Sequence, residues 1–232
     1  MTSLVFKRVE YKYLLNRDEY LNMLSYVKEH MKEDRFGEST IQSLYYDTPD
    51  YLLIRRSLEK PVYKEKLRLR SYNLADESSS VFLEIKKKSQ GVVYKRRITL
   101  KENEAVAFMQ GDEKLPSSQI ANEISYFKKY YGILRPAMLL LYDRSAFYEE
   151  GTDLRITFDR NIRYRNKDLN LHTSLDGIPL FNNGEVMVEI KATGAFPMWL
   201  VDYLSKNKIR KTSFSKYGTA YTREYKKQKL VA

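Results

Sequence analysis

The sequence predicts an α+β protein built on an antiparallel β-barrel, with a basic lumen and with helices packed outside. Two observations lead to this fold class. Strand-like segments separated by turn residues dominate the 232-residue chain, and their arginines and lysines recur at every second position. Because successive side chains of a strand point to opposite faces, this spacing gathers the cations on one face. If the sheet closes into a barrel, the cationic face of each strand lines the interior and the apolar face points outward.

The composition fits a single folded domain over residues 1–232. Hydrophobic residues make up 43% of the chain and charged residues 31%, which excludes a disordered polymer and a membrane bundle. No apolar stretch approaches the roughly 20 residues that a membrane-spanning helix requires. The N-terminus also lacks the apolar segment of a secretory signal. We therefore expect a cytoplasmic protein with no membrane span.

Cysteine is absent and histidine occurs twice, which excludes disulfides, thiolate zinc sites and cysteine nucleophiles. Any metal would therefore be held mainly by oxygen atoms. Lys and Arg number 41 against 30 Asp and Glu, and the resulting charge of +11 attracts anionic partners. The charge is compatible with several anionic partners: nucleic acid, polyphosphate, nucleotides and anionic lipid.

The first part of the chain predicts strands that alternate with short helices. Asn16 is a helix cap because acidic residues and then apolar residues at helical spacing follow it. A break at 47–50 separates the next strand from a short helical segment. The predicted elements are a strand over 6–15, a helix from Asn16 to Met31, a strand over 41–46 and a helical segment over 51–58.

An antiparallel meander follows, because three strand-like runs are joined by short polar turns. Apolar residues at helical spacing then predict a helix that ends at Gly132. Pro197 begins a later predicted helix, which continues through Ser205. The basic, tyrosine-rich tail from Lys206 to Lys229 is predicted to be a solvated charged helix, apart from Ser215 and Lys216. The predicted strands are 63–72, 80–88, 92–100, 137–148, 154–158, 170–175 and 186–192.

Charged side chains share single faces of six strands. In the first of them, the cations alternate with Leu67 and Leu69. A half-solvated strand gives the same pattern, but its repetition would place like charges side by side across the sheet, which is destabilising unless an anion lies between them. The sets are Lys64, Lys66, Arg68 and Arg70; Glu84, Lys86 and Lys88; Lys95 and Arg97; Tyr142 and Arg144; Arg155, Thr157 and Asp159; and Glu189 and Lys191.

Phosphate is the anion that this pattern favours, since the guanidinium fork matches phosphate oxygens and lysine adds mobile charge. The few acids on the same faces are Glu84, Asp159 and Glu189. Mg²⁺ and Mn²⁺ use one or two carboxylates together with phosphate oxygens and water. Glu189 is the predicted metal ligand, and an ion pair with Lys191 or a facing arginine is the alternative.

Eight short motifs follow one another along the chain: Arg8 to Tyr13, Leu44 to Thr48, Lys66 to Arg70, Phe82 to Lys86, Tyr142 to Arg144, Leu154 to Asp159, Val188 to Lys191 and Phe214 to Tyr217. In this order they resemble the VTC domain, the polyphosphate polymerase branch of the CYTH-like triphosphate tunnel metalloenzymes. Each motif alone is weak, but together they cover nearly the whole chain. Arg8 stands where the wider superfamily often has the first glutamate of Glu-x-Glu-x-Lys, which favours the polymerase branch.

The resemblance implies a tunnel in which the terminal phosphate of a nucleoside triphosphate, ATP, is added to polyphosphate with Mn²⁺ or Mg²⁺. Glu189 matches the metal ligand, and Tyr142, Ser215 and Lys216 match further tunnel contacts. The strand faces independently select most of these residues and add Lys66 and Lys191. The implied phosphate-binding cations are Lys12, Arg68, Arg70, Lys86, Lys95, Arg144 and Arg155.

We therefore predict a metal-dependent phosphotransferase, a polyphosphate polymerase, in which Arg68, Arg70, Arg144 and Arg155 hold the reacting phosphates. An inorganic triphosphatase or polyphosphatase would use the same residues with water as acceptor. A non-catalytic module that binds polyphosphate or nucleic acid is a third interpretation, with nucleic acid disfavoured because few aromatic residues interleave with these cations. The nucleotide preference, the acceptor, the oligomeric state and any membrane-bound partner subunits stay open.

Overall fold

A computed structural model gives the structure of the protein and describes residues 8–90, 92–111 and 113–226. The described chain divides into two compact units, and each is assembled from segments that are far apart in sequence. Phe6, the predicted start of the first strand, and Lys227 and Lys229 of the predicted tail helix lie outside the described residues. Unit 1 comprises residues 8–39, 142–162 and 179–214, and unit 2 comprises the described parts of 40–141, 163–178 and 215–226.

The strands hydrogen-bond in the order β1-β10-β8-β7-β3-β4-β5-β6, with β2 paired to β7 and β9 to β8. Among the described residues the order does not return from β6 to β1, so the sheet is not closed into the predicted barrel by strand pairing. Strand β6 (Val92–Lys101) presents Lys95, Arg96 and Arg97 to solvent. Charged side chains of this kind keep an edge strand from pairing.

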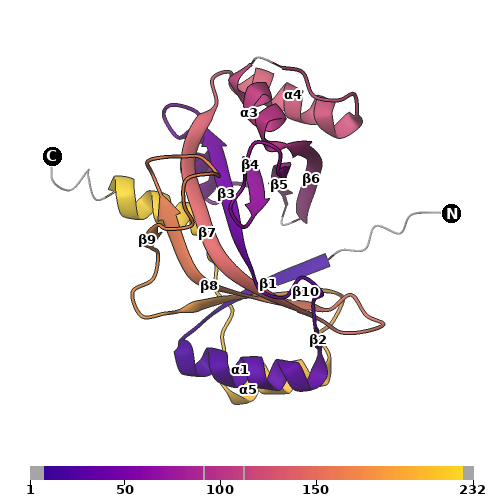
Figure 1. Ribbon diagram of the computed structural model, residues 1–232. Helices are drawn as coiled ribbons and strands as arrows, with labels where there is room; N and C mark the ends of the chain where they lie inside the picture. Colours follow the sequence, from indigo (N-terminus) through magenta and orange to yellow (C-terminus); the bar gives the residue numbers. More distant parts are fainter. Residues whose placement is uncertain (1–7, 91, 112, 227–232) are drawn as a thin grey trace. The chain divides into compact units, whose positions relative to one another are not determined.

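Unit 1 packs two helices on the apolar face of its strands. Helix α1 begins as predicted, because Asn16 accepts from the backbone of Glu19 while the Glu19 side chain accepts from that of Asn16. Helices α1 and α5 lie side by side (Figure 1), and Tyr26 stacks on Tyr203 between them. The elements are β1 (Arg8–Leu15), α1 (Arg17–His30), β2 (Lys32–Glu33), β10 (Val186–Thr193), α5 (Met198–Lys206) and parts of β7 (Arg135–Tyr148) and β8 (Arg155–Arg165).

The core of unit 1 confirms the predicted division between an apolar and a charged strand face. Ile156, Val188 and Ile190 are fully buried against the helices, whereas their sequence neighbours turn to the other face. The antiparallel register of β1 with β10, and of β10 with β8, holds this division across three strands. The charged face of unit 1 is therefore fixed by the burial of its opposite side.

Unit 2 contains the predicted meander, whose bounds match the prediction to within one residue. Its apolar face carries Leu67, Leu83 and Ile85, all fully buried, and packs with residues of α3 and α4. The elements are β3 (Ser39–Asp47), α2 (Leu52–Leu58), β4 (Tyr63–Tyr72), β5 (Ser80–Ser89), β6 (Val92–Lys101), α3 (Glu102–Gln110), α4 (Gln119–Tyr131), α6 (Lys216–Tyr221) and the π-helical segment η1 (Thr222–Lys226), with the short β9 (Ile178–Pro179) at the unit boundary.

Unit 2 differs from the sequence analysis at one helix that was not predicted and at two predictions that were wrong. Helix α3 was not predicted, because its nine residues are too few to show a clear apolar stripe. Residues 170–175 form a loop instead of a strand, since the Asn170 side chain accepts from the backbone of His172 and Thr173. The tail is not wholly solvated, because Tyr217 and Ala220 of α6 are buried.

Among the helices that the structure describes, none is both long and apolar enough to cross a bilayer.

Candidate functional site

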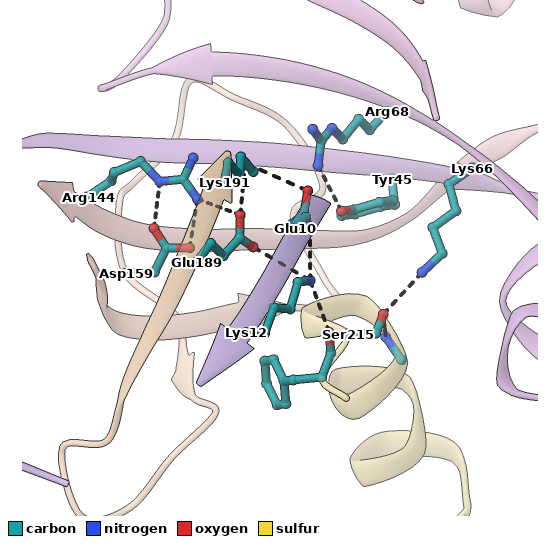
Figure 2. A network of polar contacts seen from close by, with 12 residues as sticks. Glu10, Lys12, Tyr45, Lys66, Arg68, Arg144, Asp159, Glu189, Lys191 and Ser215 are labelled. Atoms are coloured by element: carbon teal, nitrogen blue, oxygen red, sulfur yellow. Dashed lines mark hydrogen bonds and ion pairs between the residues drawn. The ribbon is translucent and has the colours of Figure 1, made fainter. Parts of the chain in front are cut away.

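Cations and carboxylates alternate on the charged face of unit 1. Strand pairing sets Lys12 opposite Glu189 and Glu10 opposite Lys191. The next strand sets Arg155 beside Lys191. The alternation predicted from the sequence is therefore present in the structure. We call the following residues the unit 1 charge cluster (Figure 2): Glu10, Lys12, Arg144, Asp159, Glu189 and Lys191.

Glu189 lies among three cations of this cluster. Its carboxylate is 3.2 Å from Nζ of Lys191, 3.6 Å from Nζ of Lys12 and 3.8 Å from Nη2 of Arg144. Glu10 shares both lysines, at 3.7 Å from Nζ of Lys12 and 3.8 Å from Nζ of Lys191. Two carboxylates are thus held near each other by common lysine partners.

The oxygen donors of Glu189 and Glu10 fit a hard divalent cation. Mg²⁺ and Mn²⁺ commonly bind one or two carboxylates and complete their coordination with substrate phosphates and water. Within the described residues, no group of three or more Asp, Glu or His side chains could hold a metal. A metal at Glu189 would therefore depend on phosphate oxygens for its remaining ligands.

Arg144 is fixed by a two-pronged bond to Asp159. Nε of Arg144 donates to Oδ1 at 2.6 Å, and Nη2 donates to Oδ2 at 2.8 Å. Asp159 is fully buried, and the guanidinium also lies 5.1 Å from the ring centroid of Tyr142. Burial opposes the charge of Arg144, but Asp159 outweighs it and raises the pKa of Arg144. The arginine is therefore a permanently charged and rigid donor.

Arg155 and Lys12 occupy more exposed parts of the same face. Arg155 pairs with Asp34 at 2.6 Å, and 45% of its side chain is exposed. Nζ of Lys12 donates to the carbonyl oxygen of Phe214 at 3.1 Å in addition to its carboxylate partners. Both cations keep surface that an incoming anion can reach.

Unit 2 carries a second group of cations around one buried carboxylate. Cross-strand pairing aligns Lys66 with Lys86 and Lys86 with Lys95, and it aligns Arg68 with Glu84. Three lysines therefore form one row across the meander. We call the following residues the unit 2 charge cluster: Tyr45, Lys66, Arg68, Arg70, Glu84, Lys86 and Lys95.

Glu84 is the counter-charge of this cluster and is only 1% exposed. Its carboxylate pairs with Arg68 at 2.7 Å, with Lys95 at 2.6 Å and with Arg70 at 3.9 Å. Burial opposes ionisation, but these three cations outweigh it and lower the pKa of Glu84 to about 2. One carboxylate thus faces three cations, and the cluster keeps a net positive charge.

The pKa values of Lys95 and Tyr45, which also belong to the unit 2 charge cluster, are strongly shifted as well. Burial lowers the pKa of Lys95 to about 8, although Glu84 acts in the opposite direction. Burial alone would raise the pKa of Tyr45, but the charges of Arg68, Lys66 and Arg70 lower it to about 7. Nη1 of Arg68 donates to Oη of Tyr45 at 3.1 Å (Figure 2).

The segment around α6 completes the surroundings of Lys66 within unit 2. Nζ of Lys66 donates to Oγ of Ser215 at 3.1 Å, and Ser215 also caps α6 (Figure 2). Tyr217 stacks on Tyr45 at 4.6 Å and donates its hydroxyl to Asp47 at 2.9 Å. Asp47 is fully buried and accepts from the first turn of α2 as well. This buried carboxylate therefore holds α6 in place.

The predicted site residues lie in two groups. Unit 1 contains Lys12, Tyr142, Arg144, Arg155, Glu189 and Lys191. Unit 2 contains Lys66, Arg68, Arg70, Lys86, Lys95, Ser215 and Lys216. Lys216 is the first residue of α6.

Sequence reasoning missed the roles of Glu10, Asp47 and Tyr217, and it did not include Tyr45 among the site residues. Glu10 could have been found from its alternation with Lys12 on the same strand face. The contact between Asp47 and Tyr217 spans 170 residues and has no local signal.

We expect Tyr45 to ionise near pH 7. The pKa of its hydroxyl is lower in the folded chain than the usual value of 10, so its contribution to stability is full above pH 10 and is lost as the pH falls through about 7. A pH titration of tyrosinate absorbance should show one early transition that Tyr45→Phe removes. The same variant should flatten the rise of stability with pH. If no tyrosine ionises below about pH 9, the cations do not act on Tyr45 as described.

Comparison with known proteins agrees with the resemblance found in the sequence. The model of a family described as the VTC domain matches residues 7–225. The protein named vacuolar transporter chaperone complex subunit 4 from Trypanosoma brucei brucei is 27% identical over 93% of this chain, and the subunit of that name from Schizosaccharomyces pombe is 26% identical over 70%. These matches cover 34% and 27% of the two relatives, so the chain spans about a third of their length.

Many solved chains resemble the fold, and two of them illustrate the likeness. A candidate adenylate cyclase from Bacillus halodurans has a TM-score of 0.61 at 14% identity, with 94% of this chain and 99% of that one covered. A candidate adenylyl cyclase from Hippeastrum, described as having a dominant triphosphatase activity, has a TM-score of 0.55 at 16% identity, with 93% and 95% covered. At this identity the likeness concerns the fold alone, which is the triphosphate tunnel fold.

Proposed function

This chain belongs to the VTC domain family, and on this premise we propose that it is a metal-dependent polyphosphate polymerase. The substrate is a nucleoside triphosphate such as ATP, and the acceptor is the end of a polyphosphate chain. The observation that carries the proposal is the gathering of arginine and lysine on single strand faces in both units, each around buried carboxylates. The unit 2 charge cluster has more cations than carboxylates, and a phosphate chain supplies the negative charge that it lacks.

The reaction needs positioning and charge neutralisation more than protein acid–base chemistry. An oxygen of the terminal phosphate of the chain attacks the γ-phosphorus, the bond from that phosphorus to the β–γ bridging oxygen breaks, and nucleoside diphosphate leaves. In this proposal the reacting phosphates are held by Arg68, Arg70, Arg144 and Arg155. The remaining phosphate contacts come from Lys12, Lys66, Lys86, Lys95, Tyr142, Lys191, Ser215 and Lys216.

The protein prepares these cations in advance. Arg144 is locked by Asp159, and Arg68 is oriented by Glu84 on one side and by Tyr45 on the other. Groups that are already oriented cost little reorganisation when the charge of the transferring phosphate develops. Glu189 and Glu10 would hold Mn²⁺ or Mg²⁺, and the bound metal would neutralise part of the phosphate charge.

Incubation of the pure protein with ATP and Mn²⁺ or Mg²⁺ tests the proposal. We expect a ladder of polyphosphate chains on a gel, formed with or without a short polyphosphate primer. Arg68→Ala should reduce chain formation at least about 100-fold, as expected for loss of a charged group that stabilises the transferring phosphate. Arg96→Ala is the matched control, because Arg96 lies on the opposite face of β6 and is exposed.

Two results would contradict polymerisation. Release of inorganic phosphate without chain growth would assign hydrolysis, the activity described for the Hippeastrum protein of the same fold. Saturable binding of polyphosphate with neither chain growth nor phosphate release would assign a binding module.

A further inference from the structure

Unit 2 contains a cavity of about 250 Å³ that the proposed function does not use. Its walls are the side chains of α4 on one side, Tyr63, Glu65 and Lys87 of the meander on another, and Arg56 of α2. Glu65 and Lys87 are directly paired across β4 and β5. They alternate with Lys66 and Lys86, so the cavity opens on the face of the meander that is opposite to the unit 2 charge cluster.

Aromatic rings dominate this cavity. The cavity is lined by Tyr63, Tyr126, Tyr130 and Tyr131 together with Phe127. Tyr126 is 67% exposed and Tyr130 is 64% exposed, and their near-parallel rings lie 6.1 Å apart. Exposed tyrosines arranged in this way offer flat apolar surface on which another aromatic ring can stack.

The polar groups of the cavity provide both acceptors and cations. Glu65 accepts from the hydroxyls of Tyr63 and Tyr131, each at 2.6 Å, so its carboxylate is oriented while further lone pairs stay open to a donor. The side chains of Arg56 and Lys87 have no hydrogen-bond or ion-pair partner in the part of the chain that the structure describes. Two unpaired cations beside stacked rings suit a ligand that is aromatic at one end and anionic at the other.

We propose that this cavity binds a nucleotide, with the base stacked on the tyrosines, a base N–H group donating to Glu65, and the phosphate held by Arg56 and Lys87. The cavity volume accommodates a base and its sugar, while the phosphate lies toward the exposed Arg56. A neutral nucleoside would leave the two cations unpaired, and inorganic phosphate would leave the rings uncovered. A mononucleotide satisfies both sets of groups.

Calorimetric titration with AMP and with GMP tests this site, each in the presence of saturating inorganic tripolyphosphate that occupies the phosphate-binding cations on the opposite face. We expect saturable binding of at least one nucleotide under these conditions. Tyr130→Ala should weaken it about tenfold or more, since each stacked base is worth a factor of that order. Lys87→Gln should weaken it by a similar factor, whereas Lys88→Gln, whose side chain lies on the other face, should leave it unchanged.

Three outcomes would overturn the proposal. Tripolyphosphate could displace the nucleotide fully, which would place nucleotide binding at the charge clusters alone. Tyr130→Ala and Lys87→Gln could both leave the affinity unchanged, or no nucleotide could bind. Because none of these measurements involves chain growth, the result is separate from the outcome of the polymerase assay.

Discussion

Glu84→Gln is expected to destabilise unit 2 by about 3 kcal/mol, the lower end of the range for removing one partner of a buried ion pair. Glu84 pairs with Arg68, Arg70 and Lys95. Glutamine preserves the shape of the side chain but removes the charge, so the mutual repulsion of three cations is no longer offset. The partial exposure of Lys95 keeps the effect from being larger. Urea denaturation measures the change.

Phosphate should partly reverse this loss. A bound anion replaces the missing counter-charge, and a ligand stabilises the folded state in proportion to its affinity for that state. Tripolyphosphate should therefore raise the melting temperature of Glu84→Gln more than that of the unchanged protein. Glu77→Gln, an exposed position in the same unit, is the matched control and should change stability by less than about 0.5 kcal/mol. An equal shift in both proteins would show that phosphate does not bind at this cluster.

Arg144→Gln is the second change with a large expected effect, about 3–5 kcal/mol of stability lost from unit 1. It removes both bonds to Asp159 and leaves a carboxylate that is fully buried without its cation. Glutamine has a single donor nitrogen, so it cannot form the two-pronged bond, and it carries no charge. Chemical denaturation measures the loss, and chain synthesis should also fall because Arg144 is a proposed phosphate contact.

Arg144→Lys tests the positive charge at position 144 separately from the planar geometry of the guanidinium group. Lysine restores the positive charge but lacks the planar fork, so it should recover part of the stability and little of the activity. Arg17→Gln, an exposed position in α1, should match the unchanged protein in both measurements. A loss below about 1 kcal/mol for Arg144→Gln would mean that water reaches Asp159 and solvates it.

The strand faces could be predicted because the period of two is a local property of the backbone. Burial of Leu67 and Ile156 on one side forces their charged neighbours to the other, and this requires no knowledge of partners. The family resemblance was likewise readable from short motifs, and the family match confirms it. A single domain stays a prediction, as do the roles assigned to the site residues and the cytoplasmic location.

Contacts between distant segments could not be predicted. The sequence shows that Glu84 shares a face with cations, but it does not show that Lys95 reaches it diagonally from the neighbouring strand. Tyr45 was not predicted as a site residue, because a tyrosine in an apolar strand usually packs in the core or on a sheet face. Only the register with Arg68 reveals the positive field around its hydroxyl.

The hydrogen bond between Asp47 and Tyr217 has a consequence for biosynthesis. Asp47 and the first turn of α2 leave the ribosome long before Tyr217 is made, and until then the buried carboxylate lacks one of its donors. Unit 1 likewise needs residues 179–214 to complete its strands. Neither unit can therefore finish folding in N-terminal order during translation, and each waits for segments that follow residue 178. A nascent chain stalled before α6 should be far more sensitive to protease than the released protein.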